Sequence, residues 1–319
     1  MVESGAGPSS KRFKMASGGE GATHVGFIGG GNLARAITEG LLQADDKQKR
    51  FKIHASFATN GENYKKMQTL GVAVTTNNKD IVLSCDVIVL SVKPHQVLPV
   101  LEELRKIYQD IDENQLLVGG APLPRNLRPL IVSVATSITI KQIEEKTEIS
   151  WKMGRADMLG HLPVIRCLPT VASSVRAGVT VYTSGHFSTE NDNKLFLDIF
   201  NSVGFTQDVP EQYIDGFTAF TGSGVAFMGL VMEALADGGV LVGIPRGMAD
   251  KIAAYTMMST AKIVIERGMK PHEIRTSVAS PGGTTIHGLK VMEDAGVRGG
   301  VMGAVQRGTE RAKELRPPS

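Results

Sequence analysis

The sequence predicts an α/β protein in which a domain built on a parallel sheet precedes an all-helical domain. Three observations support this class. Short apolar runs alternate with helical patterns from residue 24 to about residue 210, a glycine-rich turn follows the first run, and the β-branched runs stop after Glu211. Such alternation is typical of parallel sheets covered by helices. Because 319 residues exceed what one compact core usually holds, two domains are expected.

The elements of the first domain, residues 23–210, follow from its apolar patterns. Residues 1–22 are rich in Gly and Ser and are expected to form a disordered tail. Helical patterns cover Asn32–Leu42 and the residues after Pro94. The strand Asp86–Val92 is rich in Val and Ile, as expected when helices cover both faces of a sheet. The other expected strands are Val25–Ile28, Lys52–Phe57, Val72–Thr75, Ile131–Ala135, Val164–Leu168 and Val179–Tyr182.

The second domain, residues 211–319, is expected to be helical and rich in Ala, Gly and Met. Its most apolar run, Val225–Met232, ends at Glu233 and is shorter than the ~18 apolar residues that a membrane-spanning helix needs. We therefore interpret it as a buried helix of a soluble protein and expect no membrane partner. The many small residues favour close helix packing across a dimer interface.

Composition excludes several classes of protein. A net charge of +3, with basic residues spread along the chain, does not favour a nucleic-acid partner. The two cysteines, Cys85 and Cys167, have no CxxC spacing and no nearby pair of histidines, so neither a disulfide framework nor a metal site is expected. Both are interpreted as core residues of a protein in a reducing compartment, the cytoplasm, with mitochondria left open.

The turn after the first strand has the pattern GxGxxA, and it lies between a strand and a helix. Gly29 permits the tight turn, Gly31 lets the backbone approach a pyrophosphate, and Ala34 lets the helix pack closely on the sheet. The amides at the helix N-terminus supply the positive end of its dipole to the anion. This context predicts a Rossmann-type dinucleotide-binding domain.

The end of the second strand bears on the choice of cofactor. Domains specific for NAD usually place an acid there to bind the ribose hydroxyls, but no acid occurs here before Glu62. The 2′-phosphate of NADP would meet no repulsion, although no arginine follows to bind it. We therefore expect NADPH, with NADH as the alternative.

A second glycine turn, Ser280-Pro281-Gly282-Gly283-Thr284-Thr285, precedes a helical pattern near the end of the chain. Thr284 or Thr285 is well placed as the helix cap. Amides exposed at such a helix start form an anion site that could hold a small carboxylate. A helix cap without a ligand is the alternative interpretation.

These residues resemble the pyrroline-5-carboxylate reductase family. The likeness rests on Ser280–Leu289, on Thr221–Gly224 and Ala236–Gly239, and extends to Gly26–Leu33, Ser91–His95 and Val164–Pro169. Val225 and the short carboxyl end resemble the third vertebrate paralogue in particular. The family reduces a cyclic imine, pyrroline-5-carboxylate, to L-proline with NADPH or NADH, so the likeness implies an enzyme of proline biosynthesis that self-associates as a dimer or a decamer of five dimers.

The resemblance also implies the roles of individual residues. Thr285 would be the catalytic residue whose hydroxyl meets the ring nitrogen, and Glu211 would lie near the bound ring. The substrate carboxylate would bind at Ser280, Gly282, Gly283, Thr284 and Thr285. The cofactor would bind at Gly29, Gly30, Gly31, Asn32, Leu33, Asn78, Val92, Lys93, Pro94, Val134, Ala135 and Thr136.

The chain departs from the family in two kinds of position. Residues 114–130 and 151–161 look like insertions, the second with the only Trp of the chain in a polar, exposed setting. The usual Ala-Gly after the first alanine of one strand end is Thr136-Ser137, and the usual Asn and Pro farther along are Thr170 and Ala172. Because these positions are expected near the nicotinamide, they put full activity in doubt.

Two other functions stay open at this point. A 3-hydroxy-acid dehydrogenase would use Lys93 as a catalytic residue, although a cofactor-side role suits this lysine better. A binding protein for NADP without turnover would result if the departures disabled the site. His95 and His287 lie near the expected crevice, where a packing or hydrogen-bonding role is favoured over proton transfer.

Overall fold

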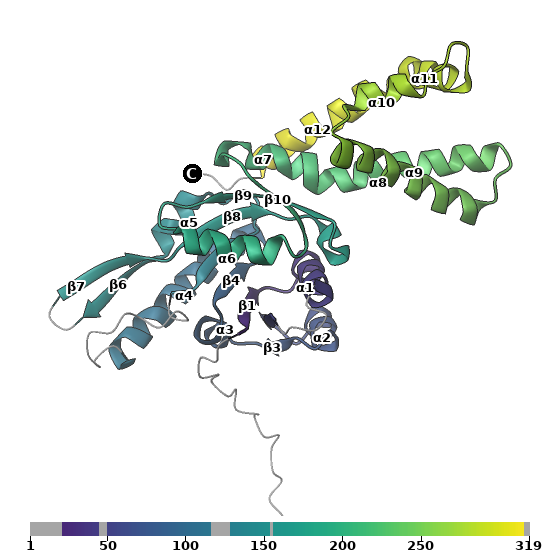
Figure 1. Cartoon of the computed structure of the whole chain (residues 1–319). Helices are drawn as coiled ribbons and strands as arrows, with labels where there is room; N and C mark the ends of the chain where they lie inside the picture. Colours follow the sequence, from purple (N-terminus) through teal and green to yellow (C-terminus); the bar gives the residue numbers. More distant parts are fainter. Residues whose placement is uncertain (1–20, 45–49, 116–127, 154–155, 316–319) are drawn as a thin grey trace, which may run out of the picture. The chain divides into compact units, whose positions relative to one another are not determined.

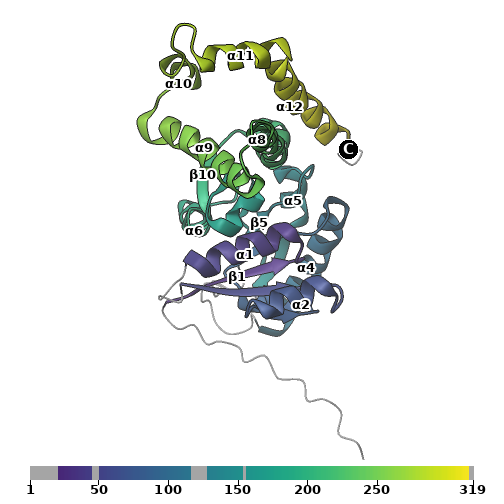
Figure 2. The same ribbon diagram turned by 90° about the vertical axis from the view of Figure 1, so that its right-hand side faces the viewer.

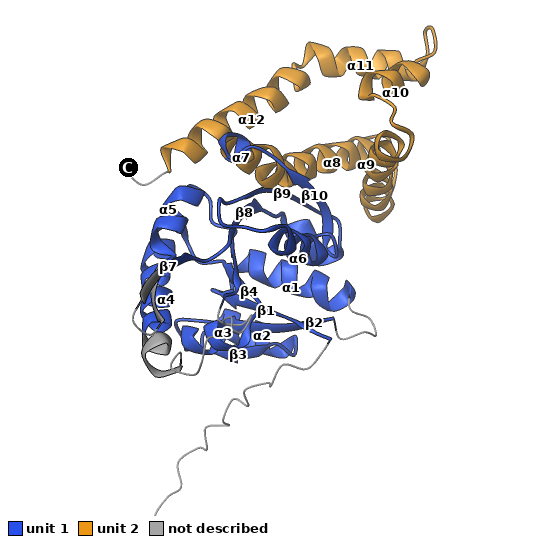
Figure 3. Ribbon diagram, turned by 60° about the vertical axis from the view of Figure 1, so that its left-hand side comes forward, with its two compact units in different colours: residues 1–214, 317–319 blue, residues 215–316 orange. Residues whose placement is uncertain are grey.

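The computed structural model describes residues 21–44, 50–115, 128–153 and 156–315, which form two compact units. Unit 1 comprises the described residues up to Ile214, and unit 2 comprises the described residues from Asp215 onward (Figure 3). Residues 1–20 of the expected tail and most of the segment 114–130 lie outside the described residues. An α/β first part and a helical second part are both confirmed.

Unit 1 is built on an eight-stranded sheet in the order β10-β9-β8-β5-β4-β1-β2-β3 (Figure 1). Its strands are β1 (Thr23–Ile28), β2 (Phe51–Ser56), β3 (Ala73–Thr75), β4 (Val87–Leu90), β5 (Leu130–Ser133), β8 (Val164–Leu168), β9 (Gly178–Ser184) and β10 (Gly204–Asp208). Its helices are α1 (Asn32–Ala44), α2 (Glu62–Thr69), α3 (Asn78–Ser84), α4 (Pro94–Gln115), α5 (Ile140–Lys146) and α6 (Glu190–Phe200), with short 3-10 turns η2 (Val171–Val175) and η3 (Glu211–Tyr213).

The expectation of a parallel sheet is wrong at one pair of strands. β8 and β9 run antiparallel, whereas the other pairs of the sheet are parallel. Only residues 169–177 connect β8 to β9, and they include the turn η2. A parallel crossover needs about a dozen residues or more, so this short connection forces the chain to turn back.

Three strands were not predicted from the sequence. β10 lies at the sheet edge and is largely exposed, so it has no apolar run to mark it. β6 (Glu148–Met153) and β7 (Ala156–His161) pair as an antiparallel hairpin that extends away from the sheet (Figure 1). The second expected insertion therefore forms most of this hairpin. The predicted exposure of Trp151 concerns a side chain outside those described.

The two faces of the sheet carry separate apolar clusters. One joins β1 to α1 and α6 through residues such as Phe27, Ile37 and Phe200. The other joins β4 to α3, α4 and α5 through residues such as Ile88 and Leu101. Figure 2 shows α1 lying along β1 at the face of the sheet. Burial of both faces explains why the central strands are continuous apolar runs.

Unit 2 consists of helices with a very small core. After α7 (Ile214–Phe217) and a π-helical turn η4 (Thr218–Ser223), it contains α8 (Gly224–Leu241), α9 (Arg246–Arg267), α10 (Pro271–Ser277), α11 (Thr284–Asp294) and α12 (Val297–Glu314). The helices α8 and α9 pack side by side through Ala236, Ala249 and Ala253, with Met232 against them (Figure 1). These small side chains permit close approach of the two helices.

The interpretation of Val225–Met232 as a buried helix is wrong for the single chain. Leu230 is 67% exposed, and Val225 and Met228 are exposed as well. Glu211–Leu241 forms one helical run that is long and apolar enough to cross a membrane by length and composition alone. Local pattern predicts that an apolar face is covered, but not whether the cover comes from the same chain.

Candidate functional site

The predicted cofactor loop lies where the strand order of unit 1 reverses. From β1 the chain proceeds to β2 and β3 on one side of the sheet, then returns to β4 and β5 on the other side. The carboxyl ends of β1 and β4 therefore diverge at a topological switch point. In open α/β sheets, ligands bind in the crevice outside such a point.

The glycine loop has the backbone that a pyrophosphate site needs. Gly29 has φ +90°, and a Cβ there would lie 2.8 Å from the Ser91 carbonyl oxygen, so a side chain would be strained and crowded. A Cβ on Gly31 would meet no heavy atom within 4 Å, which leaves its outer side open to a ligand. Ala34 is fully buried against the sheet. The loop therefore fits a dinucleotide.

The end of β4 supports the loop directly. The Ser91 hydroxyl donates to the Gly29 carbonyl oxygen at 2.6 Å, and the Ser91 amide donates to the Ile28 carbonyl oxygen at 2.9 Å. A Cβ on Gly29 would also lie 2.8 Å from the Val92 side chain. Val92, Lys93 and Pro94 thus follow the strand beside the loop, at the start of α4.

Asn78 begins α3 and bonds to two neighbouring elements. Its side-chain oxygen accepts from the Ser56 hydroxyl at 2.6 Å, and its amide donates to Glu103 at 2.8 Å. Ser56 is the last residue of β2. Asn78 therefore lies at the carboxyl edge of the sheet, two strands away from β4.

The residues after β5 complete this edge of the sheet. Val134 and Ala135 are buried, and Thr136 is half-buried. Ser137 has φ +72° although it is not glycine, and it is 5% exposed. The departure from Ala-Gly noted in the sequence therefore places a side chain in backbone geometry that glycine adopts freely. Thr170 is also buried, and its hydroxyl accepts from the Val179 amide at 3.0 Å, a bond within the fold.

A shallow cavity of about 230 Å³ follows the end of β2. Its lining includes Phe57, Thr59, Glu62 and Tyr64, and the ring of Phe57 lies against Gly30. Glu62 pairs with Lys66 at 2.5 Å, and this hydrogen bond holds the pKa of the Glu62 carboxyl below its usual range. Phe57, the residue directly after β2, therefore lies beside the glycine loop, and the acid of this cavity, Glu62, is paired with Lys66.

The second glycine turn connects α10 to α11 in unit 2. Gly282 has φ +64°, and the Gly283 amide donates to the Ser280 carbonyl oxygen at 3.1 Å. The cap of α11 is Gly283, without a side-chain hydrogen bond, and the helix begins at Thr284. The expectation that Thr284 or Thr285 caps this helix is therefore wrong. Both are inside its first turn, and their hydroxyls are left for other partners.

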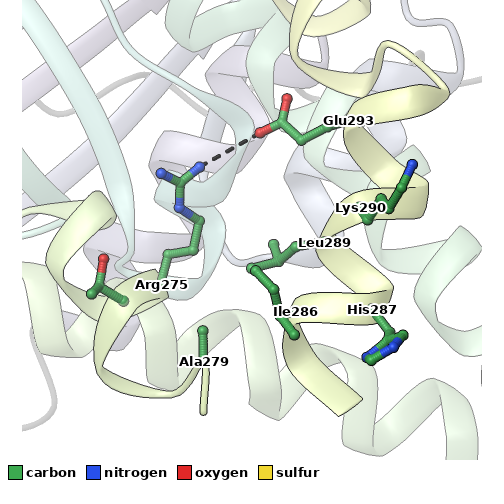
Figure 4. A pocket seen from close by; sticks show the side chains of 8 residues that line it. Arg275, Ala279, Ile286, His287, Leu289, Lys290 and Glu293 are labelled. Carbon is green, nitrogen blue, oxygen red and sulfur yellow. Dashed lines mark ion pairs between the residues drawn. The ribbon is translucent and has the colours of Figure 1, made fainter. Parts of the chain in front are cut away.

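A larger cavity, of about 720 Å³, lies between α10 and α11. Figure 4 shows Ile286 and Leu289 of α11 facing Arg275 of α10 and Ala279, which follows that helix. Arg275 pairs with Glu293 at 3.5 Å at one end. The turn Ser280–Thr285 does not itself line this cavity, although Ala279 and Ile286, which flank the turn, do.

Glu211 lies in unit 1, on η3, and is held by the sheet. Its Oε1 accepts from Arg166 Nη1 at 2.9 Å and from the Ile140 amide at 2.8 Å. The Arg166 side chain is 2% exposed and that of Glu211 is 32% exposed. Sequence reasoning assigned no role to Arg166, although a charged residue within an apolar strand is a signal that could have found it.

The structure thus brings the predicted cofactor residues to one edge of unit 1 and the predicted carboxylate residues to one turn of unit 2.

Among the described residues, no three His, Cys, Asp or Glu side chains are grouped as metal ligands would be. Both cysteines are free and buried, as expected of core residues. Burial raises the pKa of the Cys85 thiol to about 12 and also raises that of Cys167.

Two family models match the chain. The model for pyrroline-5-carboxylate reductase dimerisation covers residues 211–315, and that for an NADP oxidoreductase, coenzyme F420-dependent, covers residues 24–119.

Relatives match almost the whole chain. Pyrroline-5-carboxylate reductase 3 of Macaca fascicularis is 33% identical over 94% of this chain and 99% of its own. The protein of that name from Rattus norvegicus is 35% identical over 91% and 95%. A solved pyrroline-5-carboxylate reductase from Coxiella burnetii superposes with a TM-score of 0.71 at 30% identity, covering 93% and 99% of the two chains. The chain therefore belongs to the pyrroline-5-carboxylate reductase family.

Proposed function

We propose that this chain reduces the C=N bond of 1-pyrroline-5-carboxylate to give L-proline, with NADPH as the reductant and NADH as the alternative. The observation that carries the proposal is the turn Ser280–Thr285, an exposed glycine turn at a helix start in a chain that also has a dinucleotide loop. A 3-hydroxy-acid dehydrogenase with Lys93 as its catalytic residue is not favoured, since the relatives are pyrroline-5-carboxylate reductases.

Unit 1 would hold the cofactor. The amides of Gly29 to Leu33 would bind the pyrophosphate at the start of α1, and Asn78, Val92–Pro94 and Val134–Thr136 would line the rest of the crevice. When bound, the cofactor supplies the hydride. The open side of Gly31 supports a bound pyrophosphate, and the lack of an acid at the end of β2 favours NADPH over NADH.

Unit 2 would hold the substrate. The amides of Gly282, Thr284 and Thr285, with the hydroxyls of Ser280 and Thr284, would bind its carboxylate at the start of α11, where Gly283 is the helix cap. The Thr285 hydroxyl would hold the proton on the ring nitrogen while the hydride is added to the adjacent carbon. Protonation makes that carbon electrophilic, so the protein has mainly to orient the ring and exclude water. Glu211 near the ring is a further prediction of the resemblance.

The second unit mediates self-association, as its match to a dimerisation model indicates. Among its described residues the apolar core cluster comprises three alanines with a methionine packed against them, while Leu230, Leu241 and Ile265 are more than 60% exposed. A second copy of the chain would cover this apolar surface. Burial in a dimer therefore accounts for the apolar composition of α8 without placing the helix in a membrane. We propose a dimer, and a decamer of five dimers as the larger assembly.

We also propose that the protein works in a reducing compartment, the cytoplasm, with mitochondria as the alternative. Free, buried thiols at Cys85 and Cys167 support this proposal. Fractionation of cells that express the full chain would test it.

The experiment that tests the site compares Thr285→Ala with Thr285→Ser. NADPH oxidation on addition of 1-pyrroline-5-carboxylate should fall by about 100-fold in the alanine variant and largely recover in the serine variant, because the hydroxyl contributes mainly in the transition state. The Kd for NADPH should be unchanged in both. A larger effect on NADPH affinity than on turnover would show that the substrate has been assigned to the wrong turn.

A further inference from the structure

The carboxylate of Glu211 and its two donors form what we term the Glu211 anchor. One oxygen, Oε1, accepts both from the buried guanidinium of Arg166 at 2.9 Å and from the amide of Ile140 at 2.8 Å. Arg166 comes from the middle of β8, Ile140 begins α5 and Glu211 begins η3. The anchor therefore ties three separate elements of unit 1 at one oxygen atom.

The position of the anchor along the chain is informative. Glu211 stands three residues before Ile214, the last residue of unit 1 ahead of the helical unit. The segment before it is fastened as well: the Val209 amide donates to the Tyr182 carbonyl oxygen at 2.9 Å, and the Val209 carbonyl accepts a short bond from the Thr183 hydroxyl. The chain is thus held on both sides of Pro210 at the point where it leaves unit 1.

Stability of the fold is a poor explanation for this arrangement. Removing a guanidinium from water costs free energy that an ion pair often does not recover, and apolar replacements of buried pairs are often neutral or stabilising. The neighbours of Arg166 on β8, from Val164 to Leu168, are apolar and buried, so an apolar side chain would suit this strand. What an ion pair adds over an apolar contact is direction, because the guanidinium and the amide fix where one oxygen lies.

We propose that Arg166 is a positioning residue, which acts through Glu211 to fix the backbone where the chain passes from unit 1 to unit 2. This inference rests on the proposed function, in which unit 1 binds the cofactor and unit 2 binds the carboxylate. Hydride transfer depends on placement within about 1 Å. Loss of the contact between Arg166 and Glu211 should therefore slow turnover of the imine and leave the affinity for NADPH unchanged.

The test uses R166M, R166K, E211Q and the double variant R166M/E211Q in the full chain. R128M is the matched control, since Arg128 also belongs to unit 1 and pairs with an acid, Asp192, at 3.6 Å. For R166M we expect kcat/KM for 1-pyrroline-5-carboxylate to fall by about 10-fold or more, with partial recovery in R166K. The double variant should be no worse than the poorer single variant, because Arg166 is proposed to act through Glu211.

A second readout does not depend on activity. Tyr213 is 55% exposed and lies two residues after Glu211, so chymotrypsin cleavage after it reports whether this segment is held. Cleavage followed by mass spectrometry should be faster in R166M and E211Q than in the wild type and R128M. A wild type that fails to reduce the imine would refute the proposed function, while this comparison would still decide whether the anchor holds the segment.

Three results would overturn the proposal. The first is wild-type kcat/KM and wild-type cleavage in R166M. The second is a double variant whose loss equals the product of the two single losses, which would mean independent roles. The third is loss of NADPH binding in both R166M and R166K, which would show that Arg166 maintains the fold of unit 1 instead of positioning Glu211.

Discussion

Replacing Ser137 by glycine should stabilise unit 1. Ser137 follows β5 and has φ +72°, in the left-handed region where a Cβ approaches the carbonyl oxygen. The residue is 5% exposed, so surrounding structure holds it in this conformation. The family resemblance predicts glycine at this position, and glycine adopts this backbone conformation without strain.

Two opposing terms set the size of the effect. The left-handed conformation costs a residue with a Cβ about 1–2 kcal/mol. Glycine loses more backbone entropy on folding, which offsets about 0.5–1 kcal/mol of this gain. The net stabilisation of Ser137→Gly is therefore about 0–1.5 kcal/mol, with a central value of about 0.75 kcal/mol. In a unit of this size the central value corresponds to a rise in Tm of about 1.5–3 °C.

Thermal unfolding at pH 7, without cofactor, measures this difference. Ser137→Ala is the control, because alanine keeps the Cβ and the strain but removes the hydroxyl. The glycine variant should unfold at a higher temperature than both the wild type and the alanine variant. A glycine variant no more stable than the alanine variant would refute the reasoning, since the Cβ would then not be the source of strain.

The remaining predictions concern three other positions. Gly31→Ala should weaken NADPH binding by about 10-fold or more with an unchanged Tm, because its Cβ would meet no protein atom but would block the pyrophosphate; a lower Tm would contradict this. His54 has its pKa lowered to about 4 by burial and by the nearby charges of His24 and Lys52. Because the folded protein binds this proton less readily than the unfolded chain, the free energy of unfolding is unaffected above pH 6.5 and falls by about 3 kcal/mol as the pH drops toward 4. In His54→Phe the free energy of unfolding should therefore depend less on pH between 6.5 and 4, and an unchanged pH dependence would contradict this. Leu230→Glu should yield smaller species in light scattering, because it puts a charge on the exposed face of α8; an unchanged mass would place the interface elsewhere.

Features dictated by short-range chemistry could be predicted from the sequence. Gly29 was identified because a tight turn between a strand and a helix needs positive φ, and the structure has it at +90°. The central strands were found because burial on both faces leaves continuous apolar runs. The edge strand β10 has no such run, since Phe205 is 61% exposed, and it could not be recognised by pattern.

Features that depend on distant parts of the chain could not be predicted. The pairing of Arg166 with Glu211 joins residues 45 positions apart, and the sequence around each residue does not indicate its partner. Exposure of Leu230 depends on what covers α8, which a periodic pattern does not specify. The prediction that a threonine caps α11 is wrong because it relied on a hydroxyl that can accept an amide hydrogen bond, whereas the extended backbone of Gly283 forms the cap without a side chain.

The most direct test of the proposed reduction is to follow both sides of it with the purified full chain. NADPH is mixed with the protein and 1-pyrroline-5-carboxylate, and oxidised cofactor and L-proline are quantified together by absorbance and mass spectrometry. One molecule of proline should form for each NADPH oxidised, and no proline should form without the protein. NADPH binding with no proline formed, with either NADPH or NADH as the reductant, would show that the chain is a dinucleotide-binding protein and not a reductase of this imine.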